Sequence, residues 1–128
     1  MPELGLGAAL RTLRDRRGLN VREVGKLSDV DHAYIYRLES GEKTNPSDEM
    51  VVKLLKTLKA NDREATIVRW LANHSDADPA LVVYAMDNDV DPDAFMMAAG
   101  VRHRGQGRPD HATLIKRALA LLEDTDGQ

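Results

Sequence analysis

The apolar residues of this chain recur at intervals of three and four, which is the spacing of one buried face of an α-helix. They fall into short segments separated by residues that suit the start or the end of a helix. The first segment carries Leu6, Leu10 and Leu13, and Gly18 ends it. The pattern predicts an all-α protein.

Residues 20–41 predict two short helices joined by a tight turn, and their sequence is NVREVGKLSDVDHAYIYRLESG. Asn20 can cap the first helix, and Glu23 stands where its side chain can return a hydrogen bond to the Asn20 N–H. Asp29 falls where the chain must turn, and Asp31 can cap the second helix. This arrangement is typical of a helix-turn-helix, whose second helix enters the major groove of DNA.

The spacing within this motif predicts which side chains are buried. Val24 and Leu27 are expected to face inward, and Gly25 has no side chain, so the two helices can approach closely. Ile35 and Leu38 share the buried face of the second helix. The outward positions could reach base edges, and they are His32, Ala33, Tyr36 and Arg37.

Two further helices are predicted downstream of the motif. Ser47 can cap the first of them, whose apolar residues are Val51, Leu54, Leu55 and Leu58. The second opens at Asn61, with Glu64 three positions later, and it carries Ile67, Val68, Trp70 and Leu71.

Residues from about 5 to 74 resemble the five-helix DNA-binding domain of the XRE family of transcriptional regulators, the phage-repressor and Cro type. The pattern that carries the resemblance is LRTLRDRRGLNVREVGKLSDVDHAYIYRLESGEKTNPS, followed by LLKTL. The resemblance implies sequence-specific binding to double-stranded DNA through a recognition helix at residues 32–39. A homodimer on a palindromic operator is the usual geometry of such proteins. Gln is common in that family at the position of Val21.

The resemblance also implies roles for individual residues. An ion pair between Arg14 and Glu39 would hold the recognition helix and place Arg14 near a phosphate. Arg37 is the best candidate for a bidentate contact with guanine. Tyr34 resembles a phosphate-contacting Tyr of the family, although a core aromatic is an equal alternative. The flanking residues Asn20, Lys43, Thr44 and Asn45 suit phosphate contacts. We expect Arg11, Arg16 and Arg17 to form a solvated helix face.

A polar break near residue 75 divides the chain into an expected DNA-binding domain, residues 1–74, and a C-terminal region, residues 75–128. Three helices are predicted there, and their expected caps are Asp78, Asp91 and Asp110.

The three C-terminal helices carry more apolar surface than so short a region can easily bury alone, which favours a dimerisation unit. The candidate dimer contacts are Phe95, Ile115, Leu119 and Leu122. The alternative is an effector pocket lined by Tyr84, Met86, Phe95 and Met97, although such residues at helical spacing are usually core.

Residues 101–109, VRHRGQGRP, form a basic, glycine-rich segment between the last two predicted helices. A DNA-binding domain followed by short helices and such a segment loosely resembles repressors that a partner metallopeptidase inactivates. By that resemblance, cleavage would fall near Val101 and Arg102.

The charge is distributed unevenly along the chain. The net charge of −3 divides into +2 for residues 1–74 and −5 for residues 75–128. A modestly positive half suits a protein that makes few phosphate contacts per subunit and gains specificity from paired half-sites.

Composition excludes several other classes of protein. The chain has no Cys, its four His residues lack metal-ligand spacing, and no nucleophile–base pattern or phosphate-binding loop is present. We therefore expect neither an enzyme nor a bound cofactor or metal. No apolar run approaches the roughly 20 residues of a membrane span, and no signal-peptide pattern is present, so a cytoplasmic protein is expected.

The sequence thus favours a homodimeric, sequence-specific repressor. Two alternatives stay open. The protein could be an antitoxin whose C-terminal helices bind a toxin, or a protein-interaction module that does not bind DNA.

Overall fold

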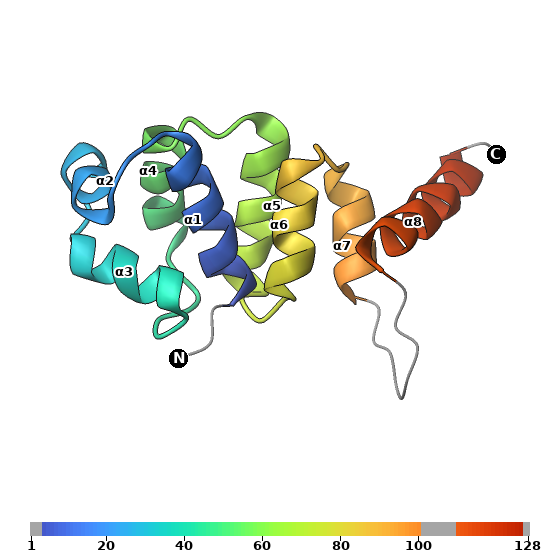
Figure 1. Cartoon of the computed structure of the whole chain (residues 1–128), viewed down its shortest axis with the longest axis horizontal. Helices are drawn as coiled ribbons and strands as arrows, with labels where there is room; N and C mark the ends of the chain where they lie inside the picture. The colour runs from blue at the N-terminus through green and yellow to red at the C-terminus, as the bar shows by residue number, and fades with distance from the viewer. Residues whose placement is uncertain (1–3, 101–109, 127–128) are drawn as a thin grey trace.

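All the regular structure in the part of the chain that the computed structural model describes, residues 4–100 and 110–126, is α-helical, as the pattern predicted (Figure 1). The helices are α1 (Gly5–Arg16), α2 (Val21–Ser28), α3 (His32–Ser40), α4 (Asp48–Thr57), α5 (Asp62–Asn73), α6 (Pro79–Asp87), α7 (Pro92–Gly100) and α8 (His111–Asp126). Within these residues, no helix combines the length and the apolar character needed to cross a membrane.

The predicted helix caps are present. Backbone N–H groups in the first turns donate to the side chains of Asn20, Asp31, Ser47, Asn61, Asp78, Asp91 and Asp110. Asn20 and Asn61 each form a complete capping box, because Glu23 and Glu64 accept a hydrogen bond from the N–H of the capping residue. Each cap satisfies an N–H group that has no partner inside its helix, so these residues determine where the helices begin.

Helix α1 lies between the two ends of the fold and packs against α3, α5 and α6 (Figure 1). Its contact with α6 is the most extensive between any two helices of the described residues. Two glycines permit these close approaches. A Cβ atom on Gly5 would lie 2.6 Å from the carbonyl oxygen of Ala77, and one on Gly7 would lie 2.3 Å from that of Glu39.

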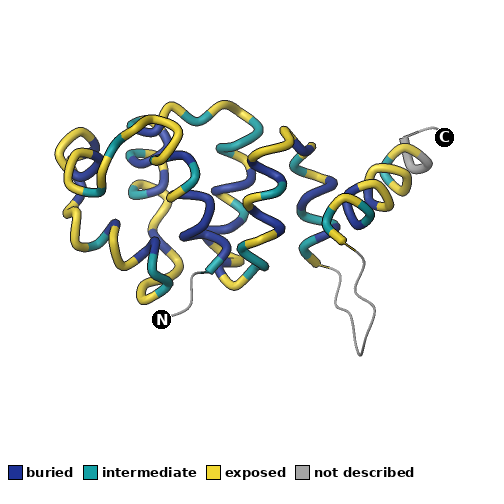
Figure 2. The backbone as a smooth tube through the Cα atoms, in the orientation of Figure 1, coloured by how far each residue is buried: buried dark blue, intermediate teal, exposed yellow. Residues whose placement is uncertain are grey.

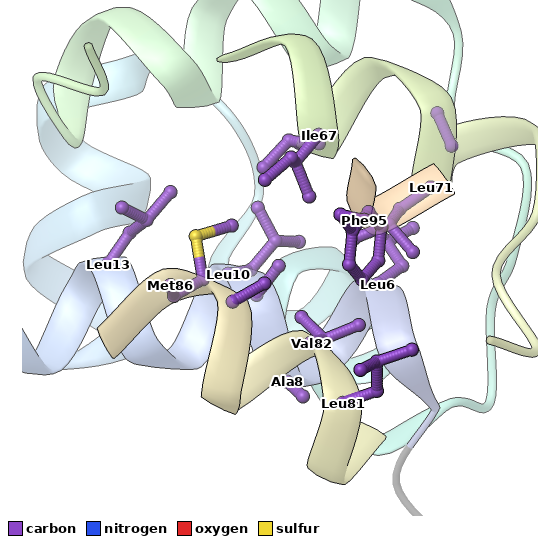
Figure 3. Close-up of a cluster of buried hydrophobic side chains, with 14 of the residues drawn as sticks. Leu6, Ala8, Leu10, Leu13, Ile67, Leu71, Leu81, Val82, Met86 and Phe95 are labelled. Carbon is purple, nitrogen blue, oxygen red and sulfur yellow. The ribbon is translucent and has the colours of Figure 1, made fainter. Parts of the chain in front are cut away.

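A single hydrophobic core runs through the molecule from Leu6 to Ala118. Figure 3 shows its central part, where Leu6 and Leu10 of α1 lie close to side chains of α5, α6 and α7. The expected boundary near residue 75 is therefore not a division of the core. Helix α6 completes the packing of α1, and the N–H of Leu6 donates to the carbonyl oxygen of Ser75 at 3.4 Å.

Arg16 connects three elements at the end of α1. Its guanidinium donates to Glu64 of α5 at 2.7 Å, and also to the Met86 carbonyl and the Asp87 carboxylate of α6. Arg16 is exposed, as expected of a solvated helix face. Its side chain also joins the end of α1 to α5 and α6.

The C-terminal helices differ in how far they are buried (Figure 2). Phe95 of α7 has no exposed surface and makes an edge-to-face contact with Trp70 of α5, at 5.6 Å between ring centroids. Ile115 is also buried within the chain, so neither side chain offers the surface expected of a dimer contact. Helix α8 packs on α7, and its Leu119 is 44% exposed. The segment 101–109, with the expected cleavage site at Val101 and Arg102, lies outside the described residues.

Candidate nucleic-acid interface

Helices α2 and α3 are joined by a turn whose geometry is set by three residues. Asp29 adopts the left-handed conformation, with φ 60° and ψ 38°. Short polar side chains tolerate this conformation better than most. Val30 is buried, and its N–H donates to the carbonyl oxygen of Gly25 at 3.1 Å. This hydrogen bond ends α2 and turns the chain toward α3.

Gly25 lies where the two helices come closest. A Cβ atom there would lie 2.8 Å from the Val30 carbonyl oxygen and 2.9 Å from the Cβ of His32. Such distances are too short for ordinary contact, so any larger residue would force α2 and α3 apart. The position of α3 relative to α2 therefore depends on glycine at position 25, which has no side chain.

Helix α3 has one buried face and one exposed face. Asp31 caps it by accepting a hydrogen bond from the Ala33 N–H at 2.9 Å. Ile35 and Leu38 are fully buried, which fixes the rotation of the helix about its axis. The opposite face is exposed and carries His32, Ala33, Tyr36 and Arg37.

The C-terminal end of α3 is anchored to α1 by an ion pair. The Nε and Nη2 atoms of Arg14 donate to the two carboxylate oxygens of Glu39, at 2.8 and 2.9 Å. The Nη1 atom donates to the carbonyl oxygen of Leu19 at 3.0 Å, so the same guanidinium also holds the segment before α2. Both side chains are largely buried, with 16% of Arg14 and 9% of Glu39 exposed.

This environment favours the charged form of Arg14. The hydrogen bond with Glu39 raises the pKa of Arg14 above its ordinary value, although burial acts in the opposite direction. Because three of its donors are already engaged, the geometry supports a structural role for Arg14. It favours that role over the phosphate contact that the resemblance implied.

The loop after α3 carries three of the expected phosphate contacts. Gly41 ends the helix in the left-handed conformation, with φ 84°, and the Lys43 N–H donates to the Arg37 carbonyl at 3.0 Å. The side chain of Lys43 is exposed beside the end of α3. Thr44 and Asn45 are also exposed, but they line a small cleft that includes Asp76. Lys43 is thus the best placed of the three to meet a phosphate.

The remaining two expected contacts have different surroundings. Asn20 is exposed, and its side-chain oxygen accepts the hydrogen bond from the Glu23 N–H, so the cap does not use its amide NH₂. Tyr34 is half-buried and packs against the core at the edge of α3. This position agrees with the core-aromatic alternative for Tyr34, because the ring contributes to packing at the rim of the exposed face.

One prediction within the motif was wrong. Leu27, expected to face inward, is 66% exposed. Val24 occupies the buried side of α2 and is 1% exposed. A helix of only eight residues has room for few inward positions, and here the contact with α3 is made through Val24 and Gly25.

Sequence reasoning missed Gly7, which allows α1 to lie against the end of α3. A signal for it was present, because α1 begins with GLGAA. Glycine inside a helix is unfavourable by about 1 kcal/mol relative to alanine, so its use in a first turn indicates close packing.

Within the described residues, no group of His, Asp or Glu side chains is arranged to hold a metal ion. The exposed side chains of α3 and its flanks offer hydrogen-bond donors and the aromatic rings of His32 and Tyr36, which are groups that contact bases and phosphates. This arrangement can bind a nucleic acid through α3, whose buried face is fixed by packing and by the Arg14–Glu39 ion pair.

Comparison with known proteins agrees with this geometry. Residues 5–66 match the family described as a helix-turn-helix domain. No curated protein matches the chain. The matched residues begin with α1 and extend into α5, so they include α2, the turn and α3. Residues 5–66 are therefore similar to helix-turn-helix domains, a fold with which many regulators bind DNA.

Proposed function

We propose that this protein is a sequence-specific regulator of the XRE type that binds double-stranded DNA. The observation that carries the proposal is the contrast between the two faces of α3. One face is fixed by Ile35, Leu38 and the Arg14–Glu39 ion pair, and the other exposes the side chains of four residues. In this proposal the protein binds DNA and catalyses no reaction.

The exposed face supplies groups for direct readout in the major groove. Arg37 can donate two hydrogen bonds to O6 and N7 of a guanine, and Ala33 can contact a thymine methyl group. His32 lies at the start of α3, where its ring can donate to a base or a phosphate. Asn20 and Lys43 flank the helix and are the candidates for phosphate contacts.

A homodimer on a palindromic operator is part of the same proposal. Helix α3 has nine residues, so it spans only about 13 Å and can read only a few base pairs. Two copies bound to half-sites about 34 Å apart would supply the missing specificity. The exposed apolar side chains of α8, including Leu119, support a contact with a second copy. A dimer bound within a promoter would act as a repressor by blocking access to it.

The proposal is tested by fluorescence anisotropy with labelled DNA from upstream of the gene, and with a shuffled duplex of the same composition. Wild type and Arg37→Ala are compared at two salt concentrations. A matched control is Arg69→Ala, because Arg69 is an exposed arginine on α5 rather than on α3.

The expected result is tight, salt-dependent binding of the upstream DNA that Arg37→Ala weakens and Arg69→Ala does not. Weakening on all sequences alike would identify Arg37 as a phosphate contact. Equal, weak binding of both duplexes by wild type would contradict an operator in this region. Absence of binding to either duplex would favour a protein-interaction module.

A further inference from the structure

The C-terminal ends of α2 and α4 border an open groove of about 600 Å³ that the recognition surface does not use. Its lining residues are Leu27, Ser28, Lys53, Lys56, Thr57 and Lys59. Leu27 gives the groove an apolar surface, because most of its large side chain is exposed there. Removing this apolar surface from water would be favourable for a partner that covered it.

The lysines give the groove a strong positive character. Lys53 makes one long ion pair, 3.8 Å from Glu49, and both side chains are well exposed, so the contact is weak. No ion pair engages Lys56 or Lys59 within residues 4–100 and 110–126. A groove with an apolar floor and a basic rim fits the apolar face of an acidic helix.

The chain itself contains a helix of that kind. The C-terminal part of α8 exposes Leu119 and carries the sequence LALLEDTD. Three of its last four residues are acidic, and no basic residue lies in its last turn. Negative charge at the C-terminal end of a helix is unfavourable because it adds to the negative end of the helix dipole. Lysine side chains from another molecule would neutralise it.

Helix α8 cannot reach this groove in its own chain. Figure 1 shows α2 and α4 at one end of the long axis and α8 at the other, with α1, α5, α6 and α7 between them. The occupant must therefore come from outside the molecule. A second copy supplies both the apolar and the acidic groups that the groove would bind.

We propose that the C-terminal end of α8 docks into the groove between α2 and α4 of a second copy. Each chain has one groove and one α8, so reciprocal docking closes a symmetric dimer in which the same contact is made twice. This inference rests on the homodimer of the proposed function and names its contact surfaces. It also accounts for the exposure of Leu27, which becomes buried in the dimer.

The experiment is sedimentation velocity of the full chain over a range of concentrations, without DNA. One variant reverses charge in the groove, Lys53→Glu with Lys56→Glu, and another reverses charge on α8, Glu123→Lys with Asp124→Lys. Each should weaken self-association about tenfold or more, and an equimolar mixture of the two should restore it. Arg69→Glu is the matched control, since it changes charge to the same sign elsewhere on the surface.

A third variant tests the apolar part of the contact. Leu27→Ser removes an exposed side chain, so the fold is retained while self-association is expected to weaken about tenfold. Circular dichroism of every variant verifies that the helices are intact. This variant keeps the test decisive if a double charge reversal disturbs folding.

Several results would overturn the inference. They are a wild-type chain that stays monomeric at every concentration, charge reversals that leave the dimer unchanged, and a mixture that does not recover association. A groove variant that loses DNA affinity yet dimerises normally would show that the lysines contact phosphate instead. Because association is measured without DNA, a failure of operator binding is recorded separately and refutes the proposed function alone.

Discussion

Substitution of Gly7 by alanine sets two opposing effects against each other. Alanine is favoured over glycine in a helix by about 1 kcal/mol. The new Cβ atom, however, would lie 2.3 Å from the carbonyl oxygen of Glu39 and 2.8 Å from the carbonyl carbon. A carbon and a carbonyl oxygen in ordinary contact lie about 3.3 Å apart, so α1 and α3 must separate by about 1 Å.

The clash should prevail over the helix propensity. Both atoms that the methyl group meets belong to the backbone, so no side-chain rotation can relieve the contact. Overpacking of this kind costs about 1–3 kcal/mol. After the gain in propensity, we expect Gly7→Ala to lower the free energy of unfolding by up to about 2 kcal/mol. Affinity for DNA should also fall, because Glu39 and the end of α3 are displaced together.

Urea unfolding followed by Trp70 fluorescence measures the effect. The midpoint should fall without a change in the m-value. Gly100→Ala is the matched control, because it too lies in a helix and no described atom stands within 4 Å of the added Cβ. The urea midpoint of Gly100→Ala should equal or slightly exceed that of wild type. If Gly7→Ala were as stable as wild type, the close approach of α1 and α3 would not be the reason for this glycine.

Three further predictions concern single side chains. Glu39→Gln should lower the free energy of unfolding by about 1–3 kcal/mol, because it leaves the largely buried Arg14 without its carboxylate. Urea unfolding measures this change, and an unchanged midpoint would contradict the anchoring role of the ion pair. Arg37→Ala should weaken operator binding by about 1–3 kcal/mol and relax one base preference, measured with substituted duplexes; a loss on every duplex alike would assign Arg37 to a phosphate. A hydrogen bond from the Thr113 N–H lowers the pKa of Asp110. The stability that this cap contributes is therefore present above the ordinary pKa of the carboxyl group, and it is lost as pH falls through the lowered pKa. The stability difference between wild type and Asp110→Ala should therefore shrink on acidification, and a difference that is constant with pH would contradict the cap.

The helices and their starting points could be predicted because the responsible contacts are local. A capping side chain bonds to an N–H two or three residues ahead, so Asn20 with Glu23 and Asn61 with Glu64 are recognisable from spacing alone. The two faces of α3 followed from the helical period for the same reason.

Contacts between distant segments could not be read in this way. The role of Arg16 depends on Glu64 and Asp87, which lie 48 and 71 residues away along the chain. The exposure of Leu27 depends on how α4 lies beside α2, and nothing in an eight-residue pattern reports that. Phe95 was assigned to a dimer contact because its three-helix region was treated as a separate unit with more apolar surface than it could bury alone. Helix α7 instead packs on α5.

The packing of α1 has a consequence for how this protein unfolds. Helix α1 packs against α3 on one side and against α6 on another. Without α1, neither the helix-turn-helix nor the C-terminal helices would retain a closed hydrophobic core. The helix-turn-helix and α6 therefore belong to one cooperative unit that is expected to melt in a single transition. A molecule that captures α6 in a detached state would unfold the recognition helix without ever contacting it.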